Sequence, residues 1–150
     1  MSDIKENLHR LCAEYVQQRM HAAEHAIAGA QQSANDDTKS SAGDKYETGR
    51  EMAQQETNRN LAQLNEANKL MVALNHINPR SVSATAKPGS LVITDNGSFY
   101  ISISAGNLFW EGENYFAISP VSPIGLQLKD KHAGERFILN GKNYLIRSVL

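Results

Sequence analysis

The sequence predicts an α+β protein in which an antiparallel hairpin of two long helices, a coiled coil, precedes a small antiparallel β domain with one short helix. Residues 4–32 and 44–75 are rich in helix-forming residues, and both carry apolar residues three and four apart. A polar segment, 33–43, separates them and is the predicted tip. Residues 78–150 change to short alternating apolar runs between turn residues. We therefore assign residues 1–77 to the hairpin and 78–150 to the β domain.

The first predicted helix has an apolar stripe with the spacing of a coiled-coil seam. Its large members are Ile4, Leu8, Leu11 and Tyr15. Beyond Val16 the stripe is expected to continue through small residues, namely Ala22, Ala23, Ala26, Ala28, Gly29 and Ala30. Because the distance between packed helices depends on the side chains at the contact, we expect the two helices to approach closely toward the tip.

The second predicted helix begins near Asp44, a favourable N-cap after Gly43, and ends near Asn75, ahead of Asn78-Pro79. Its expected seam consists of Tyr46, Met52, Leu61, Leu64, Ala67, Met71 and Leu74, with polar Thr57 and Asn68 within it. Buried polar residues in a seam lower stability but fix the register of the pairing. With no other core nearby, each helix is expected to bury its apolar stripe on the other.

The β domain is predicted from alternating apolar residues and from two turn signals. Strands are expected near 91–93, 99–103, 115–118, 137–139 and 144–149. Asn96-Gly97 and Asn140-Gly141 have the composition of two-residue hairpin turns. Ser122 followed by Pro123 predicts the start of a short helix, because serine caps helices and proline is favoured at the first helical position.

Composition narrows the classes of function. The chain has 150 residues and a net charge of −1, which disfavours a general electrostatic grip on nucleic acid. Residues 1–76 hold eleven acidic and eight basic residues, whereas residues 77–150 hold five and seven. The single cysteine, Cys12, cannot form an internal disulfide and is expected to be a buried thiol. No signal-peptide core or membrane-length apolar run is present, so we expect a cytoplasmic protein.

One segment of the β domain resembles the C-terminal signature of the GreA/GreB transcript-cleavage factor family. The segment is Ile118-Ser119-Pro120-Val121-Ser122-Pro123-Ile124-Gly125, followed by Leu128, Lys129, Gly134, Glu135 and a closing hairpin. The layout of the whole chain resembles the family as well. The resemblance implies an FKBP-like β domain that docks on bacterial RNA polymerase, while the helical hairpin enters the secondary channel. It places the docking residues at Ser122, Pro123, Ile124, Gly125, Lys129 and Lys131.

In that family, acids at the hairpin tip help to hold a catalytic magnesium ion of the polymerase, so that backtracked RNA is cut. The family's tip resembles Asp-x-Ser-Glu-Asn-x-x-Tyr. Anchoring this pattern on Ser41 and Tyr46 places Lys39 and Ala42 where the two acids should stand. The candidate catalytic acids are instead Asp36, Asp37 and Asp44. They also fit the ordinary roles of aspartate in turns and N-caps, so both interpretations of the tip stay open.

Three classes of function follow from these observations. The first is an RNA-polymerase-binding elongation regulator with no cofactor of its own, whose tip shares Mg²⁺ with the polymerase if it promotes cleavage. The second is a peptidyl-prolyl isomerase, suggested only by the FKBP-like fold. The third is a coiled-coil adaptor unrelated to transcription. A free-standing enzyme is not expected, because the sequence has no nucleotide-binding loop, nucleophilic triad or dense metal cluster.

A second open question concerns the aromatic pairs Phe109-Trp110 and Tyr115-Phe116. They are expected mainly in the core, because a small domain needs large apolar side chains, with a sticky binding edge as the alternative. Lys129, Lys131 and Arg136 form a basic group that serves either as a solvated face or as a docking patch.

Overall fold

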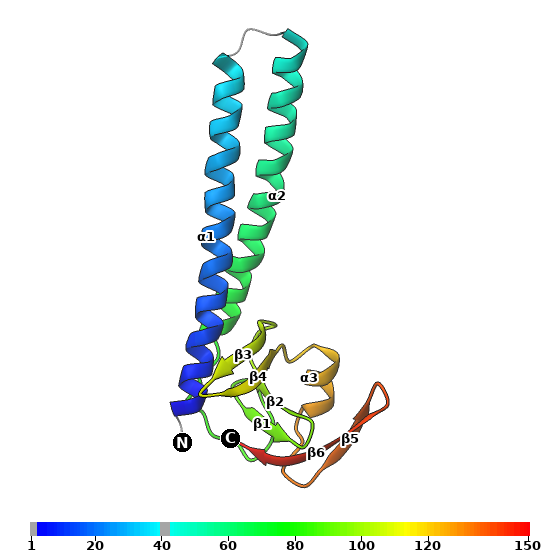
Figure 1. The fold of residues 1–150 in the computed structure, drawn as a ribbon. Coiled ribbons are helices and arrows are strands. Elements are labelled where there is room, and N and C mark those ends of the chain that lie inside the picture. The colour runs from blue at the N-terminus through cyan, green and yellow to red at the C-terminus, as the bar shows by residue number, and fades with distance from the viewer. Residues whose placement is uncertain (1–2, 40–42) are drawn as a thin grey trace. The chain divides into compact units, whose positions relative to one another are not determined.

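A computed structural model describes the backbone of residues 3–39 and 43–150 and the side chains of residues 4–32 and 51–150 (Figure 1). It confirms the α+β fold class: a pair of long helices precedes a six-stranded, mostly antiparallel sheet and a short helix. The elements are α1 Asp3–Lys39, α2 Gly43–Asn75, β1 Leu91–Thr94, β2 Gly97–Ile101, β3 Gly106–Trp110, β4 Glu113–Ile118, α3 Pro123–Leu128, β5 Arg136–Leu139 and β6 Lys142–Val149.

The chain divides into two compact units. One unit combines the residues up to Tyr15 with Met71–Leu150, and the other is Val16–Leu70. The residues of α1 up to Tyr15 and those of α2 from Met71 therefore belong to the same compact unit as the sheet. Within the described residues, no helix is long and apolar enough to cross a membrane.

In the Val16–Leu70 unit, α1 and α2 run as a helical pair. The predicted tip was 33–43, but α1 continues to Lys39, so residues 33–39 are helical. Residues 40–42, which complete the predicted tip, lie outside the described part of the chain. The start of α2 at Gly43 agrees with the predicted start near Asp44.

The seam of this unit consists of small and polar side chains. The buried residues are Val16, Ala23, Ala30, Ala53, Thr57, Asn60 and Ala67. Thr57 was predicted at this seam, but Met52 and Leu61 are 64% and 42% exposed, and Asn68 is exposed too. Successive residues on an α-helix lie about 100° apart, so Ala53 and Asn60, one position away, take their places. The buried residues of α2 recur at the spacings of four and three that pairing with α1 requires, and the largest side chains of α2 do not all stand at those positions.

The sheet has the strand order β3-β4-β2-β1-β6-β5, in which only the β2–β4 pair is parallel. The β1–β2 hairpin is confirmed, but Thr94 pairs with Gly97, so its two-residue turn begins one position before the predicted Asn96-Gly97. At the β5–β6 turn, Asn140 and Gly141 both have positive φ, 52° and 77°, as a type I′ turn requires. β3 was not predicted.

α3 covers one face of the sheet. Its Leu128 belongs to the core cluster on that face, which also contains Ala86, Val92, Phe99, Ile101, Phe137 and Ile146. The opposite face of β2 contacts the first turns of α1, since His9 Nδ1 lies 2.9 Å from the hydroxyl of Tyr100. Ser102, which directly follows β2, adds a second contact, with its Oγ 3.6 Å from Cys12 Sγ. Alternation of side chains along β2 thus serves two different helices.

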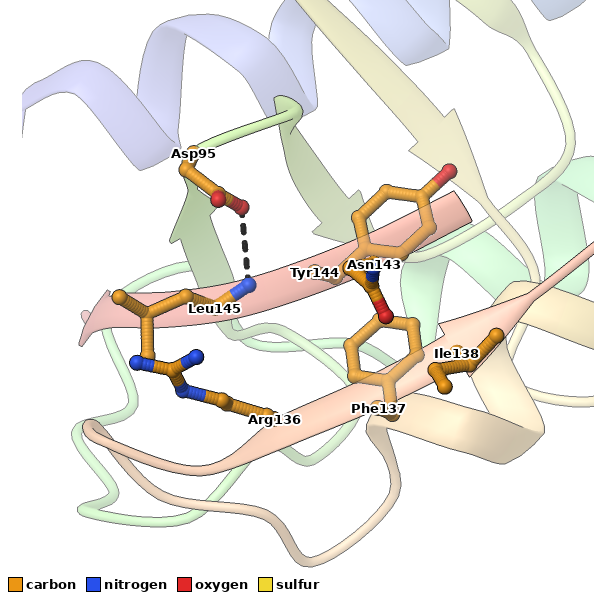
Figure 2. Close-up of a pocket in the computed structure, with 7 residues that line it drawn as sticks. All are labelled: Asp95, Arg136, Phe137, Ile138, Asn143, Tyr144 and Leu145. Atoms are coloured by element: carbon orange, nitrogen blue, oxygen red, sulfur yellow. Dashed lines mark hydrogen bonds between the residues drawn. The ribbon is translucent and has the colours of Figure 1, made fainter. Parts of the chain in front are cut away.

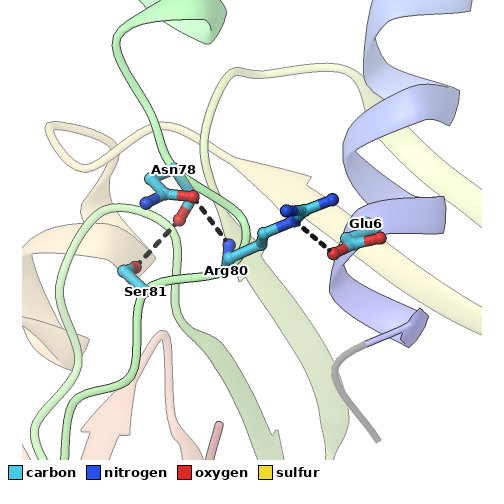
Figure 3. Close-up of polar contacts among 4 residues, drawn as sticks. All are labelled: Glu6, Asn78, Arg80 and Ser81. Atoms are coloured by element: carbon cyan, nitrogen blue, oxygen red, sulfur yellow. Dashed lines mark hydrogen bonds and ion pairs between the residues drawn. The ribbon is translucent and has the colours of Figure 1, made fainter.

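The turn after α2 is held by local and long-range contacts (Figure 3). Asn78 accepts hydrogen bonds from the Arg80 amide, 2.9 Å, and from the Ser81 hydroxyl, 2.8 Å. Arg80 Nε lies 2.7 Å from a carboxylate oxygen of Glu6 on α1. Because Arg80 is exposed and Glu6 only half-buried, this ion pair contributes at most about 1 kcal/mol.

The two aromatic pairs are split between core and surface. Tyr115 is buried and Trp110 is half-buried, with the Arg10 guanidinium 5.5 Å from the Trp110 ring centre. Phe109 and Phe116 are exposed. The expectation of core positions is correct for Tyr115 and wrong for the two phenylalanines. Their strands, β3 and β4, lie at the end of the sheet opposite β5, the strand that α3 contacts.

Candidate docking site

Ser122 begins α3 with a double hydrogen bond. Its Oγ accepts a hydrogen bond from the Gly125 amide at 3.1 Å and donates one to the Ser119 carbonyl at 2.7 Å. Pro123 occupies the first turn, where its missing N–H costs nothing. The two contacts of Ser122 therefore fix both the start of the helix and the loop that leads into it.

Gly125 lets this loop pack directly on the helix. A Cβ at this position would overlap the carbonyl oxygen of Ser119 and lie 3.0 Å from the carbonyl carbon and oxygen of Pro120. These are backbone atoms, so a side chain here would force the loop and the helix apart. The glycine sets the distance between the Ser119–Pro120 loop and α3.

The segment at Ala86 closes the other side of the site. The Ala86 amide donates to the Lys131 carbonyl at 2.8 Å, and its carbonyl accepts from the Asp130 amide at 3.0 Å. Asp130 has a φ of 61°, a left-handed conformation that aspartate tolerates better than most residues. The turn after α3 is thereby fastened to a segment more than forty positions earlier in the sequence.

An apolar cavity of about 280 Å³ lies between these pieces. It is lined by Ala86, Lys87, Pro88, Ile101, Pro120, Val121, Gly125, Leu126 and Lys129. Val121 and Leu126, which line this cavity, are 79% and 59% exposed, so they form an apolar surface that a partner could cover. The side chains of Lys87 and Lys129 have no carboxylate partner among the described residues. The site can take an apolar side chain and attract a carboxylate beside it.

The predicted docking residues have different places in this arrangement. Gly125 and Lys129 line the cavity, Ser122 caps α3, and exposed Pro123 is the first residue of α3. Ile124 packs against the core cluster, and the main chain of Lys131 holds Ala86. They are thus neighbours in space, although only Gly125 and Lys129 face the cavity.

The sequence analysis missed Lys87, Pro88, Val121 and Leu126 as members of this site. Leu126 lies within α3, so a helical projection would have placed it away from buried Leu128. Val121 precedes the helix and is not part of that projection. Lys87 and Pro88 carried no such signal, because their position beside α3 depends on the sheet.

The predicted tip acids lie in helices. Asp36 and Asp37 belong to α1 and Asp44 to α2, and their side chains are outside the described part of the chain. Among the residues whose side chains are described, no group of three or more His, Cys, Asp or Glu residues is arranged to hold a metal ion.

A second polar cluster joins the first turns of α1 to β2. Burial raises the pKa of the Cys12 thiol, with the Ser102 hydrogen bond acting in the opposite direction, and burial also lowers the pKa of His9. Burial and the nearby Cys12 raise the pKa of Tyr100. Cys12 is fully buried and held as a thiol, so this cluster has the properties of a structural anchor and not those of a nucleophilic site.

Comparison with models of known protein families and with curated proteins finds no match to this chain.

Proposed function

We propose that this protein binds bacterial RNA polymerase and regulates transcript elongation through the secondary channel. The α3 face is its docking surface, and the helical hairpin is the part that enters the channel. The observation that supports this proposal most is the position of the apolar cavity. The segment that resembles the docking domain of the GreA/GreB family contains exposed Val121 and Leu126, and also Lys129, which has no carboxylate partner among the described residues.

The chemistry of the cavity suits a protein partner. Covering Val121 and Leu126 would remove apolar surface from water, which favours association by about 25 cal/mol per Å². Lys87 and Lys129 at the rim would meet carboxylates of the partner, so binding should weaken as salt is raised.

The test is capture of bacterial core RNA polymerase by the immobilised 150-residue chain. The full chain is used because Leu8 and Cys12 of α1 belong to the same compact unit as the sheet and are fully buried. Leu126→Glu and Lys129→Glu should each abolish or strongly reduce capture. Lys142→Glu makes the same charge change on β6, away from this cavity, and should leave capture intact. Absence of capture by the wild-type chain would reject the proposal.

Within this function we favour occupation of the channel without RNA cleavage. Lys39 and Ala42 stand where the family's tip acids should be, and Asp36 and Asp37 lie in the helical part of α1. A backtracked elongation complex is incubated with the wild type and with the Asp36→Asn/Asp37→Asn and Asp44→Asn variants. No cleavage by saturating wild type is expected. Cleavage that disappears in the variants, with capture retained, would instead assign Mg²⁺-dependent chemistry to the tip acids.

A further inference from the structure

The β5–β6 hairpin carries an open cavity that the proposed function does not use. Figure 2 shows its lining, and the cavity measures about 560 Å³. The lining residues are Asp95, Arg136, Phe137, Ile138, Asn143, Tyr144 and Leu145. Arg136 pairs with Leu145 and Ile138 with Asn143, so these four side chains share one face of the hairpin. Ile138 is 65% exposed there, a large apolar side chain without cover.

The main chain of β5 is free along one edge. β5 is the last strand of the sheet, and its two-residue turn makes Leu139 and Lys142 a hydrogen-bonded pair. By alternation Phe137 also bonds to β6, and therefore the N–H and C=O groups of Arg136 and Ile138 point away from it. The partner of Arg136 on β6 follows the same alternation. Its main chain points away from β5, since the Leu145 amide donates to Asp95 Oδ1 at 2.8 Å.

The hairpin is also positively charged. Arg136, Lys142 and Arg147 have no carboxylate partner among the described residues. Asp95 is the one acid that lines the cavity, and one of its oxygens already accepts the Leu145 amide. The face that carries Arg136 and Ile138 therefore combines a guanidinium without a carboxylate partner in the described residues, an exposed apolar side chain and, along the β5 edge, free main-chain donors and acceptors.

We infer that the edge of β5 binds an extended peptide segment in which an acidic residue and an apolar residue stand two positions apart, so that both lie on the face of Arg136 and Ile138. The segment adds as a strand to Arg136 and Ile138, sets an apolar side chain against Ile138, and places a carboxylate on the Arg136 guanidinium. Strand addition uses the free main-chain groups for affinity and the side-chain pockets for specificity. Charge complementarity selects an acidic partner over a basic one.

A single-stranded nucleic acid would also be attracted by the three cations. It would leave the main-chain edge and the Ile138 side chain without partners, and the two stacked rings of Phe137 and Tyr144, 4.8 Å apart, are already paired with each other. The observations therefore favour the peptide.

The test uses the 150-residue chain, labelled with ¹⁵N, and a capped synthetic heptapeptide with glutamate at its second and sixth positions, valine at its fourth and threonine elsewhere, so that glutamate and valine share one face. We expect amide shifts centred on β5, and slower hydrogen exchange of the outward Ile138 amide when the peptide is present. A peptide with lysine in place of glutamate, and an oligouridylate of the same length, should give neither effect. Shifts that spare β5, or equal binding of the lysine peptide or the oligonucleotide, would overturn the inference.

Variants make the test specific. Arg136→Glu should weaken binding of the acidic peptide at least tenfold at low salt, and Ile138→Ser should weaken it without changing its salt dependence. Both residues are exposed, and the amide spectrum of each variant reports directly whether the fold is kept. Lys129→Glu, in the α3 cavity, should bind the peptide like the wild type. Equal affinity of the wild type and Arg136→Glu would refute the assigned contact. Because capture of polymerase is measured separately with the α3 variants, failure of one proposal leaves the other standing.

Discussion

Replacement of Gly125 by alanine should destabilise the sheet-containing unit, although alanine is the better helix former. The added Cβ would overlap the Ser119 carbonyl oxygen and lie 3.0 Å from two backbone atoms of Pro120. Overpacking of this kind costs about 1–3 kcal/mol, and the upper end applies because backbone atoms cannot rotate away. The gain in helix propensity returns about 1 kcal/mol. We expect a net loss of about 2 kcal/mol, or roughly 4–8 °C in Tm for a chain of this length.

The measurement is urea unfolding followed by the fluorescence of Trp110, the single tryptophan, which lies in the unit that contains Gly125. Gly29→Ala is the matched control, because Gly29 is exposed in α1 and a Cβ there meets nothing within 4 Å. That variant should gain up to about 1 kcal/mol by far-ultraviolet circular dichroism. If Gly125→Ala unfolds within about 0.5 kcal/mol of the wild type, the close approach of loop and helix is not as described.

Three further predictions concern buried polar groups. Burial lowers the pKa of His9, so as pH falls below the ordinary value of 6.5 the unfolded chain takes up a proton before the folded chain does. The free energy of unfolding should therefore decrease as pH falls from 7 to about 5. In the His9→Gln variant it should change less over the same pH range. Cys12 is fully buried with a raised thiol pKa, so a thiol reagent should label the native chain slowly and the urea-unfolded chain rapidly; fast native labelling would contradict its burial. The Asn60 amide nitrogen is buried without a hydrogen-bond partner in the described residues, so Asn60→Ala should stabilise the helical pair by about 1 kcal/mol in thermal unfolding, whereas a loss of stability would indicate an amide that is satisfied.

Several elements could be predicted from the sequence because a few neighbouring residues determine where they begin or end. The Ser122 cap with Pro123 predicted the start of α3, and Asn140-Gly141 predicted a turn whose two residues both need positive φ. The end of α2 before Asn78-Pro79 was predicted for a similar reason, since the residue before proline disfavours helix. In each case a few neighbouring residues decide the conformation by sterics or by one hydrogen bond.

The seam of the helical pair could be predicted only in part. Heptad spacing was recognised, and Thr57 and Ala67 were placed in it correctly. The choice between Met52 and Ala53 depends on how α1 and α2 are rotated about their axes, which no single helix specifies. Size argued for Met52, but the pairing buries Ala53 and leaves the methionine in solvent.

The candidate docking site shows what the sequence by itself determined and what only the tertiary structure decided. The sequence determined Gly125 and Lys129, because both lie within one short segment around α3. Lys87 joins them only because the Ala86 main chain bonds to the turn after α3, and the cations of β5–β6 form a surface only because that hairpin ends the sheet. Local propensity is set within a few residues, whereas a binding surface collects side chains from strands whose order is settled by the burial of the whole core.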